Sequence, residues 1–211
     1  TITFYDSDGE VFLEKTYPKN QNWVTLDEIS PYVIDGFIAT EDRNFYNHMG
    51  FDPIRIAKAV LVNITTGSKS QGASTITQQY ARNLFSDFDK TWERKIKEAF
   101  YALKLEIAYD KETILEGYLN TINFGHGNYG IEDAALFYFD KHASELTLEE
   151  ASVLVGIPKG PSYYSPLINY ENAMSRKQIV LKSMLVEDYI TQEEYDLALN
   201  TEATIIGEHP E

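Results

Sequence analysis

The chain has 211 residues, of which 43% are hydrophobic, and it carries 33 Asp and Glu against 18 Lys and Arg, with no cysteine. This acidic balance argues against a general nucleic-acid binder and against a protein held to an anionic membrane by its overall charge. The absence of cysteine excludes disulfides and thiolate metal sites, and it fits a protein outside the cytoplasm.

A chain of this length can bury one good hydrophobic core, so we expect one main domain. It contains no run of about 18 apolar residues that would cross a membrane, and no signal peptide. The protein is then either soluble or a fragment that lacks an anchor. The start in an apparent strand and the loose end at 207–211 favour the fragment.

Residues 1–15 predict a β-hairpin, because β-forming side chains flank the turn pair Asp8-Gly9. An isolated two-stranded ribbon is marginal in stability, so it must pack on the main domain or on a missing neighbour. We therefore expect a ribbon and linker over 1–24, a main domain over 25–200, and the start of a linker to a further domain over 201–211.

The next segment carries a helix start, with Ser30 as N-cap and Pro31 at the first helical position. Its apolar stripe includes Phe37, and the same spacing continues to Glu41 and His48. Glu41 is therefore predicted to be buried. Desolvation favours the neutral form of a carboxylate and suits it to proton transfer. The alternative is a structural acid held by His48 or Arg43.

Two later helices carry most of the remaining pattern. Residues 53–66 form an amphipathic helix whose apolar side we assign to ordinary core, with a membrane-facing lobe as the alternative. After a flexible stretch at 67–72, the small residues of 73–79 would let the backbone approach a ligand. The helix at 90–109 is apolar on two faces, so we expect it to be buried on both sides and to run through the middle of the domain. The predicted core stripe is Trp92, Ile96, Ala99, Phe100, Leu103 and Ile107, and the opposite face is Arg94, Lys95, Glu98, Ala102, Leu105 and Tyr109.

Further helices are predicted over 111–120, 130–139, 147–157, 170–188 and 191–199, so the chain is mainly α with a short β-ribbon. The segments 123–130 and 158–166 are predicted as rigid, turn-rich loops, and His126 in the first could touch a substrate.

Two acids, Glu41 and Glu98, stand at the polar edges of apolar helices, and paired carboxylates across a cleft suit glycosyl transfer. Near Gln78 and Gln79, seven basic residues fall within about forty positions and suggest a phosphate or diphosphate site. These residues are Lys69, Arg82, Lys90, Arg94, Lys95, Lys97 and Lys104. The alternative is a solvated helix face balanced by Glu93, Glu98 and Glu106, in which Arg94 and Glu98 form a surface pair.

The remaining polar residues of this part of the chain carry weaker signals. His48 is either a structural hydrogen-bonding residue beside Gly50 or a proton carrier, and we favour the structural role. Asp42 could position Arg43 or a substrate amide. No spacing of acids or histidines predicts a tight metal site.

Five ordered motifs then give the chain a resemblance to a known family. The first four are Glu41-Asp42-x-x-Phe45-x-x-His48-x-Gly50, Gly72-Ala73-Ser74-Thr75-Ile76-Thr77-Gln78-Gln79, Arg94-Lys95-x-x-Glu98 and Lys111-x-x-Ile114-Leu115-x-x-Tyr118-Leu119-Asn120. The fifth is Arg176-Lys177-x-x-Val180-Leu181, with lysine where a second arginine is usual. Over nearly its whole length the chain resembles the peptidoglycan glycosyltransferase domain, glycosyltransferase family 51, of class A penicillin-binding proteins and monofunctional transglycosylases.

The resemblance implies a lysozyme-like, two-lobed helical fold with a small membrane-associated lobe at about residues 51–72. It also implies the reaction. The 4-hydroxyl of lipid II attacks the anomeric carbon of a growing glycan held on undecaprenyl diphosphate, and a β-1,4 bond forms with inversion. The expected location is the outer face of the bacterial cytoplasmic membrane, with a fused transpeptidase domain and cell-wall synthesis proteins as further partners.

By the same resemblance Glu41 is the general base, and Glu98 supports the donor side directly or through a divalent cation, Mg or Mn. The residues expected to hold the diphosphate and sugars are Asp42, Ser74, Gln78, Gln79, Arg82, Asn83, Lys90, Arg94 and Lys95, and this is also the moenomycin site of the family. Arg82 replaces the lysine of many relatives. Phe45, His48, Gly50 and Asn120 are expected to be structural residues near the site. The rival hypotheses are a lysozyme-like hydrolase and a non-catalytic partner-binding domain.

Overall fold

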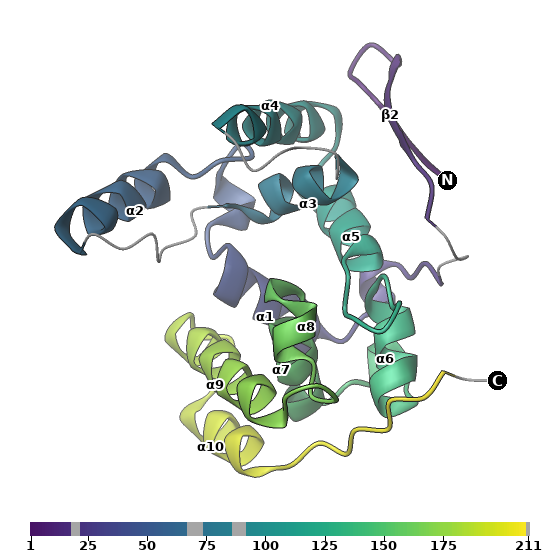
Figure 1. Ribbon diagram of the computed structural model, residues 1–211, viewed down its shortest axis with the longest axis vertical. Helices are drawn as coiled ribbons and strands as arrows, with labels where there is room; N and C mark the ends of the chain where they lie inside the picture. Colours follow the sequence, from purple (N-terminus) through teal and green to yellow (C-terminus); the bar gives the residue numbers. More distant parts are fainter. Residues whose placement is uncertain (18–21, 67–73, 86–91, 210–211) are drawn as a thin grey trace. The chain divides into compact units, whose positions relative to one another are not determined.

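The computed structural model describes residues 1–17, 22–66, 74–85 and 92–209. As predicted, the part of the chain within these ranges is mainly α-helical and contains one two-stranded sheet (Figure 1). It divides into two compact units, the first made of residues 1–17 and 44–115 and the second of residues 18–43 and 116–211. The predicted division at residues 24 and 200 stays a prediction. No described helix is long and apolar enough to span a lipid bilayer.

The first unit begins with the predicted ribbon, in which β1 (Ile2–Tyr5) pairs antiparallel with β2 (Val11–Lys15). Phe4 faces Leu13 across the ribbon, and an irregularity follows between Phe4 and Tyr5. The ring of Phe4 contacts the rings of Tyr80 and Tyr109, and the Tyr5 amide donates to the Tyr109 hydroxyl at 2.8 Å. The ribbon is therefore held to the helices of its own unit.

Three helices complete most of the first unit: α2 (Pro53–Thr66), α3 (Ile76–Leu84) and α4 (Trp92–Ala108). The helix α5 (Lys111–Thr121) begins there and continues into the second unit. The helix α3 was not predicted from the small residues of 73–79. Its start is written in the sequence as Thr75-x-x-Gln78, a capping box that the structure contains.

The prediction that α4 is buried on both sides is wrong. Ile96, Phe100 and Ile107 are 68%, 55% and 59% exposed, whereas Glu98, Ala102 and Leu105 are buried. The reason is steric, because a side chain at Gly50 would come within 3.1 Å of the backbone of Ala102. The small side of α4 therefore packs closely against the polypeptide, and its large apolar side chains lie on the other side.

The apolar side of α2 is likewise not ordinary core, which corrects the preferred prediction. Ile54, Leu61 and Ile64 are 68%, 62% and 75% exposed, and Ala59 is buried. A short helix that exposes several large aliphatic side chains presents a surface suited to an apolar partner.

The second unit holds the remaining helices. They are α1 (Pro31–Glu41), most of α5, α6 (Ile131–Phe139), α7 (Leu148–Gly156), α8 (Pro161–Tyr164), α9 (Tyr170–Val186) and α10 (Gln192–Asn200). Short 3-10 turns occur at Leu26–Glu28, Ala143–Glu145 and Ile157–Lys159, and another in the first unit at Phe45–Asn47. The helices predicted over 111–120, 130–139, 147–157, 170–188 and 191–199 are all present within two residues of their expected ends, and α8 lies in a segment predicted as a loop.

The helix α1 packs against both α7 and α9, which also pack against each other (Figure 1). Gly36 permits this approach, because a side chain there would meet Val155 of α7 at 3.0 Å. Pro31 occupies the first turn as predicted, but the hydroxyl of Ser30 does not cap the helix and donates to the Leu146 carbonyl at 2.9 Å. The C-terminal end of α1 is thus buried among helices.

Candidate active site

Glu41 is the last residue of α1, and Asp42 follows it as the C-cap. Both side chains are buried, at 8% and 1% exposure, as the stripe of α1 predicts for Glu41. The amide of Asp42 donates to the Ile38 carbonyl at 3.1 Å, which closes the last turn of the helix. Two acids at a helix C-terminus meet the negative end of the helix dipole, so this position calls for positive charge nearby.

Arg176 of α9 supplies such a charge. Its Nη2 donates to Oε1 of Glu41 at 3.2 Å, and the two side chains are 13% and 10% exposed. The structural alternative for Glu41 named Arg43 as a partner, but Arg43 lies on the surface, 3.7 Å from Glu187. The sequence analysis named Arg176 in the fifth motif without giving it a partner, and the structure shows its contact with Glu41.

A second group of candidate residues surrounds the start of α3. Thr75 is the N-cap: its Oγ1 accepts from the Gln78 amide at 3.1 Å, and Oε1 of Gln78 accepts from the Thr75 amide at 2.9 Å. The side-chain amide oxygen of Gln78 therefore caps the start of α3. Ser74 precedes the cap, at the positive end of the helix dipole where anions are favoured. Gln79 and Arg82 are half-buried along α3, and Asn83 is exposed.

The start of α4 brings charge to the same place. Glu98 is 1% exposed, and its two oxygens lie 3.3 Å from Nε of Arg94 and 3.5 Å from Nζ of Lys95. Lys95 also donates to the Ser74 hydroxyl at 3.1 Å, which links α4 to the residue before the N-cap of α3. Glu98 is thus a buried acid under two basic side chains, and not one member of a simple surface pair. Lys90 lies outside the described residues.

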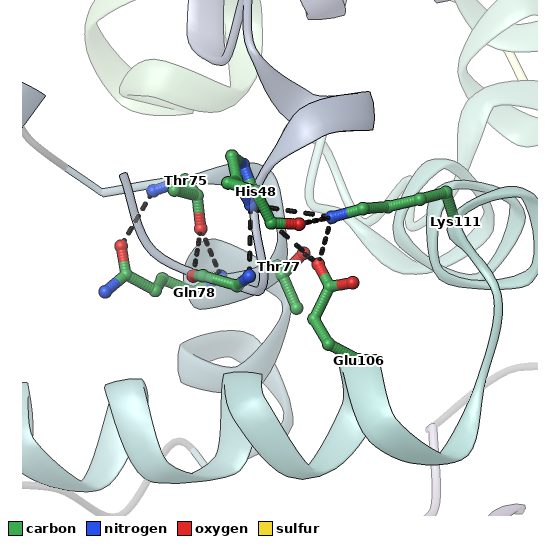
Figure 2. Close-up of polar contacts among 7 residues, drawn as sticks. His48, Thr75, Thr77, Gln78, Glu106 and Lys111 are labelled. Atoms are coloured by element: carbon green, nitrogen blue, oxygen red, sulfur yellow. Dashed lines mark hydrogen bonds and ion pairs between the residues drawn. The ribbon is translucent and has the colours of Figure 1, made fainter. Parts of the chain in front are cut away.

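A buried polar network includes Thr75, the N-cap of α3, and is shown in Figure 2. Nζ of Lys111 donates to the His48 carbonyl and to Oε1 of Glu106, each at 2.6 Å. The Thr77 hydroxyl donates to the same Glu106 oxygen at 2.8 Å, and Thr75 donates to the Gly50 carbonyl at 2.7 Å. These bonds join the loop after residue 44 to α3, α4 and α5.

Within that network His48 has a structural part. Its Nδ1 accepts from the Gly50 amide at 3.0 Å, and Gly50 adopts φ of +94°, which favours glycine. Phe45 is fully buried, its ring lies against the His48 ring, and Nζ of Lys111 stands 4.8 Å from the Phe45 ring centre. The loop is therefore fixed by packing and by hydrogen bonds together.

Asn120 of α5 holds a different segment. Its Nδ2 donates to the carbonyls of Val24 and Glu116, each at 2.8 Å, and its Oδ1 accepts from the Val24 amide at 2.9 Å. This side chain satisfies the backbone of Val24 on both sides. His126, which could touch a substrate, pairs through Nε2 with the Ser165 hydroxyl at 2.8 Å.

The candidate residues fall in both units. Glu41, Asp42 and Asn120 belong to the second unit, and the group around Ser74, Lys95 and Glu98 belongs to the first. The pairing of Glu41 with Glu98 therefore stays a prediction. Glu41 has Arg176 beside it in the second unit, and Glu98 has Arg94 and Lys95 beside it in the first.

The residues around Glu98 do not fit a divalent cation. A metal ion of this kind takes several oxygen ligands, but Arg94 and Lys95 flank this carboxylate and would repel a cation. Within the described part of the chain no group of three or more His, Cys, Asp or Glu is arranged to hold a metal. The donor set suits an anion, so no step is assigned to a metal here.

The structure is that of a mainly helical protein in which buried acids lie beside basic side chains. The chain belongs to the transglycosylase family, whose model, described as "Transglycosylase", matches residues 8–185. The resemblance carried by the five sequence motifs is thereby confirmed.

Similar proteins agree with this assignment. The chain is 50% identical to penicillin-binding protein 2D of Bacillus subtilis over 91% of its length, and 46% identical to penicillin-binding protein 1A of Aquifex aeolicus over 97%. The crystal structure of penicillin-binding protein 1A from Haemophilus influenzae matches 96% of the chain with a TM-score of 0.56 and 27% identity. The chain covers 28% of each of the first two proteins and 20% of the crystallised one, so it spans about a quarter of its relatives' length.

Proposed function

We propose that this chain is a peptidoglycan glycosyltransferase that polymerises lipid II into β-1,4-linked glycan. The observation that carries the proposal is a group of residues suited to an anion at the start of α3, called the anion-suited group: Ser74, Arg94, Lys95 and Glu98. Lys95 donates a hydrogen bond to Ser74, and Glu98 forms ion pairs with Arg94 and Lys95. A helix N-terminus with two basic side chains suits a diphosphate. Membership of the transglycosylase family supports the same reaction.

In the proposed reaction the 4-hydroxyl of lipid II attacks the anomeric carbon of the glycan held on undecaprenyl diphosphate. Glu41 accepts the hydroxyl proton as the carbon–oxygen bond forms, and the bond to the diphosphate breaks with inversion. Lys95, Arg94 and the first amides of α3 take up the charge that develops on the departing diphosphate. Glu98 sets the positions of the two basic side chains. Arg82, Gln79, Asn83 and Lys90 are also proposed to bind the donor.

The exposed aliphatic side chains of α2 support association with the outer face of the cytoplasmic membrane. A lipid-linked substrate places the reacting sugars close to the bilayer surface. Ile54, Leu61 and Ile64 could enter the interfacial region without a membrane-spanning segment. A fused transpeptidase domain and other cell-wall synthesis proteins are proposed partners, since relatives named as penicillin-binding proteins are much longer than this chain.

The direct test uses labelled lipid II in one reaction and finished glycan in another. The proposal expects new polymer from lipid II and no shortening of the glycan. Shortened glycan without new polymer would make the protein a lysozyme-like hydrolase, and no change in either substrate would leave a non-catalytic binding domain.

A second test addresses the anion-suited group. Lys95→Ala removes the bond to Ser74 and one charge beside Glu98, so affinity for the phosphoglycolipid moenomycin should fall by roughly tenfold, as for the loss of one charged hydrogen bond. Lys182→Ala, an exposed lysine of α9, is the matched control. Equal affinities of both variants and the unaltered protein, measured by titration calorimetry, would remove the diphosphate role.

A further inference from the structure

The contact between Glu41 and Arg176 joins two helices that are 135 residues apart in sequence. It is formed by one nitrogen and one oxygen, at 3.2 Å, and both side chains are close to nine-tenths buried. A hydrogen bond from a fixed guanidinium restricts the rotation of a carboxylate. The orientation of the Glu41 carboxylate therefore depends on where Arg176 is held.

Two features of the second unit hold Arg176. Its guanidinium carbon lies 5.8 Å from the ring centre of Tyr164 in α8. The second feature is Gly156, the last residue of α7. A Cβ atom added there would come within 2.7 Å of the Arg176 Cγ. Gly156 is helical with φ of −72°, so the turn does not require glycine there. The absence of a side chain at Gly156 leaves room for the Cβ and Cγ atoms of Arg176.

The contact between Glu41 and Arg176 is also an ion pair. Glu41 is buried at the C-terminal end of α1, which carries the negative end of the helix dipole, so a cation is favourable beside it. Arg176 supplies this cation through the ion pair with Glu41. Removing one member of such a buried pair leaves the other uncompensated.

We propose that Arg176, which lies between Tyr164 and Gly156, is a positioning residue that orients the Glu41 carboxylate for proton acceptance. The inference rests on the proposed role of Glu41 as general base. Arg176 acts through Glu41 and not on the diphosphate, which distinguishes it from Arg94 and Lys95. Its loss should therefore reduce kcat for lipid II polymerisation and leave KM nearly unchanged.

The experiment is a double-mutant cycle of Arg176→Met and Glu41→Gln, in which kcat and KM for lipid II polymerisation are measured at steady state. Arg176→Met should lower kcat by about 10- to 100-fold, as a misplaced catalytic group does, and change KM by less than about threefold. Arg176→Lys, which keeps the charge without the planar fork, should recover part of kcat. In the Glu41→Gln background, Arg176→Met should cost less than about twofold, because the group it serves is gone. Arg43→Met, an exposed arginine near the same helix end, is the control and should keep full kcat.

Full kcat in folded Arg176→Met, or an equal loss in both backgrounds, would overturn the inference. If circular dichroism shows that Arg176→Met does not fold, Gly156→Ala gives the test, because it displaces Arg176 without removing it. Folded Gly156→Ala should lose kcat in the unaltered background and not beside Glu41→Gln, and full kcat in both Gly156→Ala and Arg176→Lys would be the contrary result. Failure of the proposed function has a different signature, since the unaltered protein would then make no polymer.

Discussion

The buried pair of Lys111 and Glu106 should be a main source of stability for the first unit. Their side chains are 16% and 3% exposed, and Nζ of Lys111 lies 2.6 Å from Oε1 of Glu106 and from the His48 carbonyl. Removing one partner of a buried ion pair costs about 3–5 kcal/mol, because the remaining charge stays buried. In Lys111→Met, Glu106 keeps the Thr77 hydroxyl, so we expect a loss near the lower end, about 3 kcal/mol.

That loss corresponds to a decrease in Tm of roughly 6–12 °C for a chain of this size. Differential scanning calorimetry measures it, and Lys58→Met, at an exposed lysine of α2, is the matched control. In the double variant with Glu106→Gln the loss should be smaller than the sum of the two single losses, because no unpaired charge remains. A Tm for Lys111→Met within 2 °C of the control, together with additive single losses, would refute the ion pair as a source of stability.

Two further outcomes follow from other parts of the chain. The hydrogen bond and charge of Glu132 raise the pKa of His142 above its usual 6.5, so this pair stabilises the fold fully below pH 6.5 and loses its contribution as the pH rises through the raised pKa. His142→Gln should therefore destabilise more at pH 5.5 than at pH 8.5 in denaturant titrations, and an equal effect at both values would contradict the assignment. On α2, Ile64→Asp should weaken binding to lipid vesicles by a measurable factor in sedimentation, whereas Lys58→Ala on the same helix should change it less; unaltered binding of Ile64→Asp would exclude α2 from the membrane contact.

The sequence predicts the elements of this fold better than their surroundings. Pro31 and the stripe through Phe37 locate α1 and the burial of Glu41, because helix starts and 3.6-residue periodicity are local properties. The same reasoning fails for α4. Its large residues, such as Phe100, suggest the core side, but the close approach at Ala102 selects the small side. Which face of a doubly apolar helix is buried depends on neighbours that periodicity does not identify.

The candidate site shows a similar division. The spacing of Arg94, Lys95 and Glu98 predicts that their side chains lie close together, because the three residues fall within about one helical turn, and the structure agrees. The bond from Arg176 to Glu41 could not be predicted, because no spacing relates residues of α1 and α9 before the helices pack. The capping box of Thr75 and Gln78 can be recognised in the sequence. In it the side-chain amide oxygen of Gln78 accepts a hydrogen bond from the Thr75 amide.

The central claim is that one carboxylate, that of Glu41, accepts the proton of the attacking hydroxyl. It is tested most directly by the rate of lipid II polymerisation in Glu41→Gln, with Glu171→Gln at an exposed glutamate of α9 as the control. Glutamine preserves size and burial but cannot serve as the base, so the rate should fall by at least about 10²–10⁴-fold with Tm unchanged or raised. A polymerisation rate in Glu41→Gln close to that of the control would make Glu41 a structural acid and contradict the account.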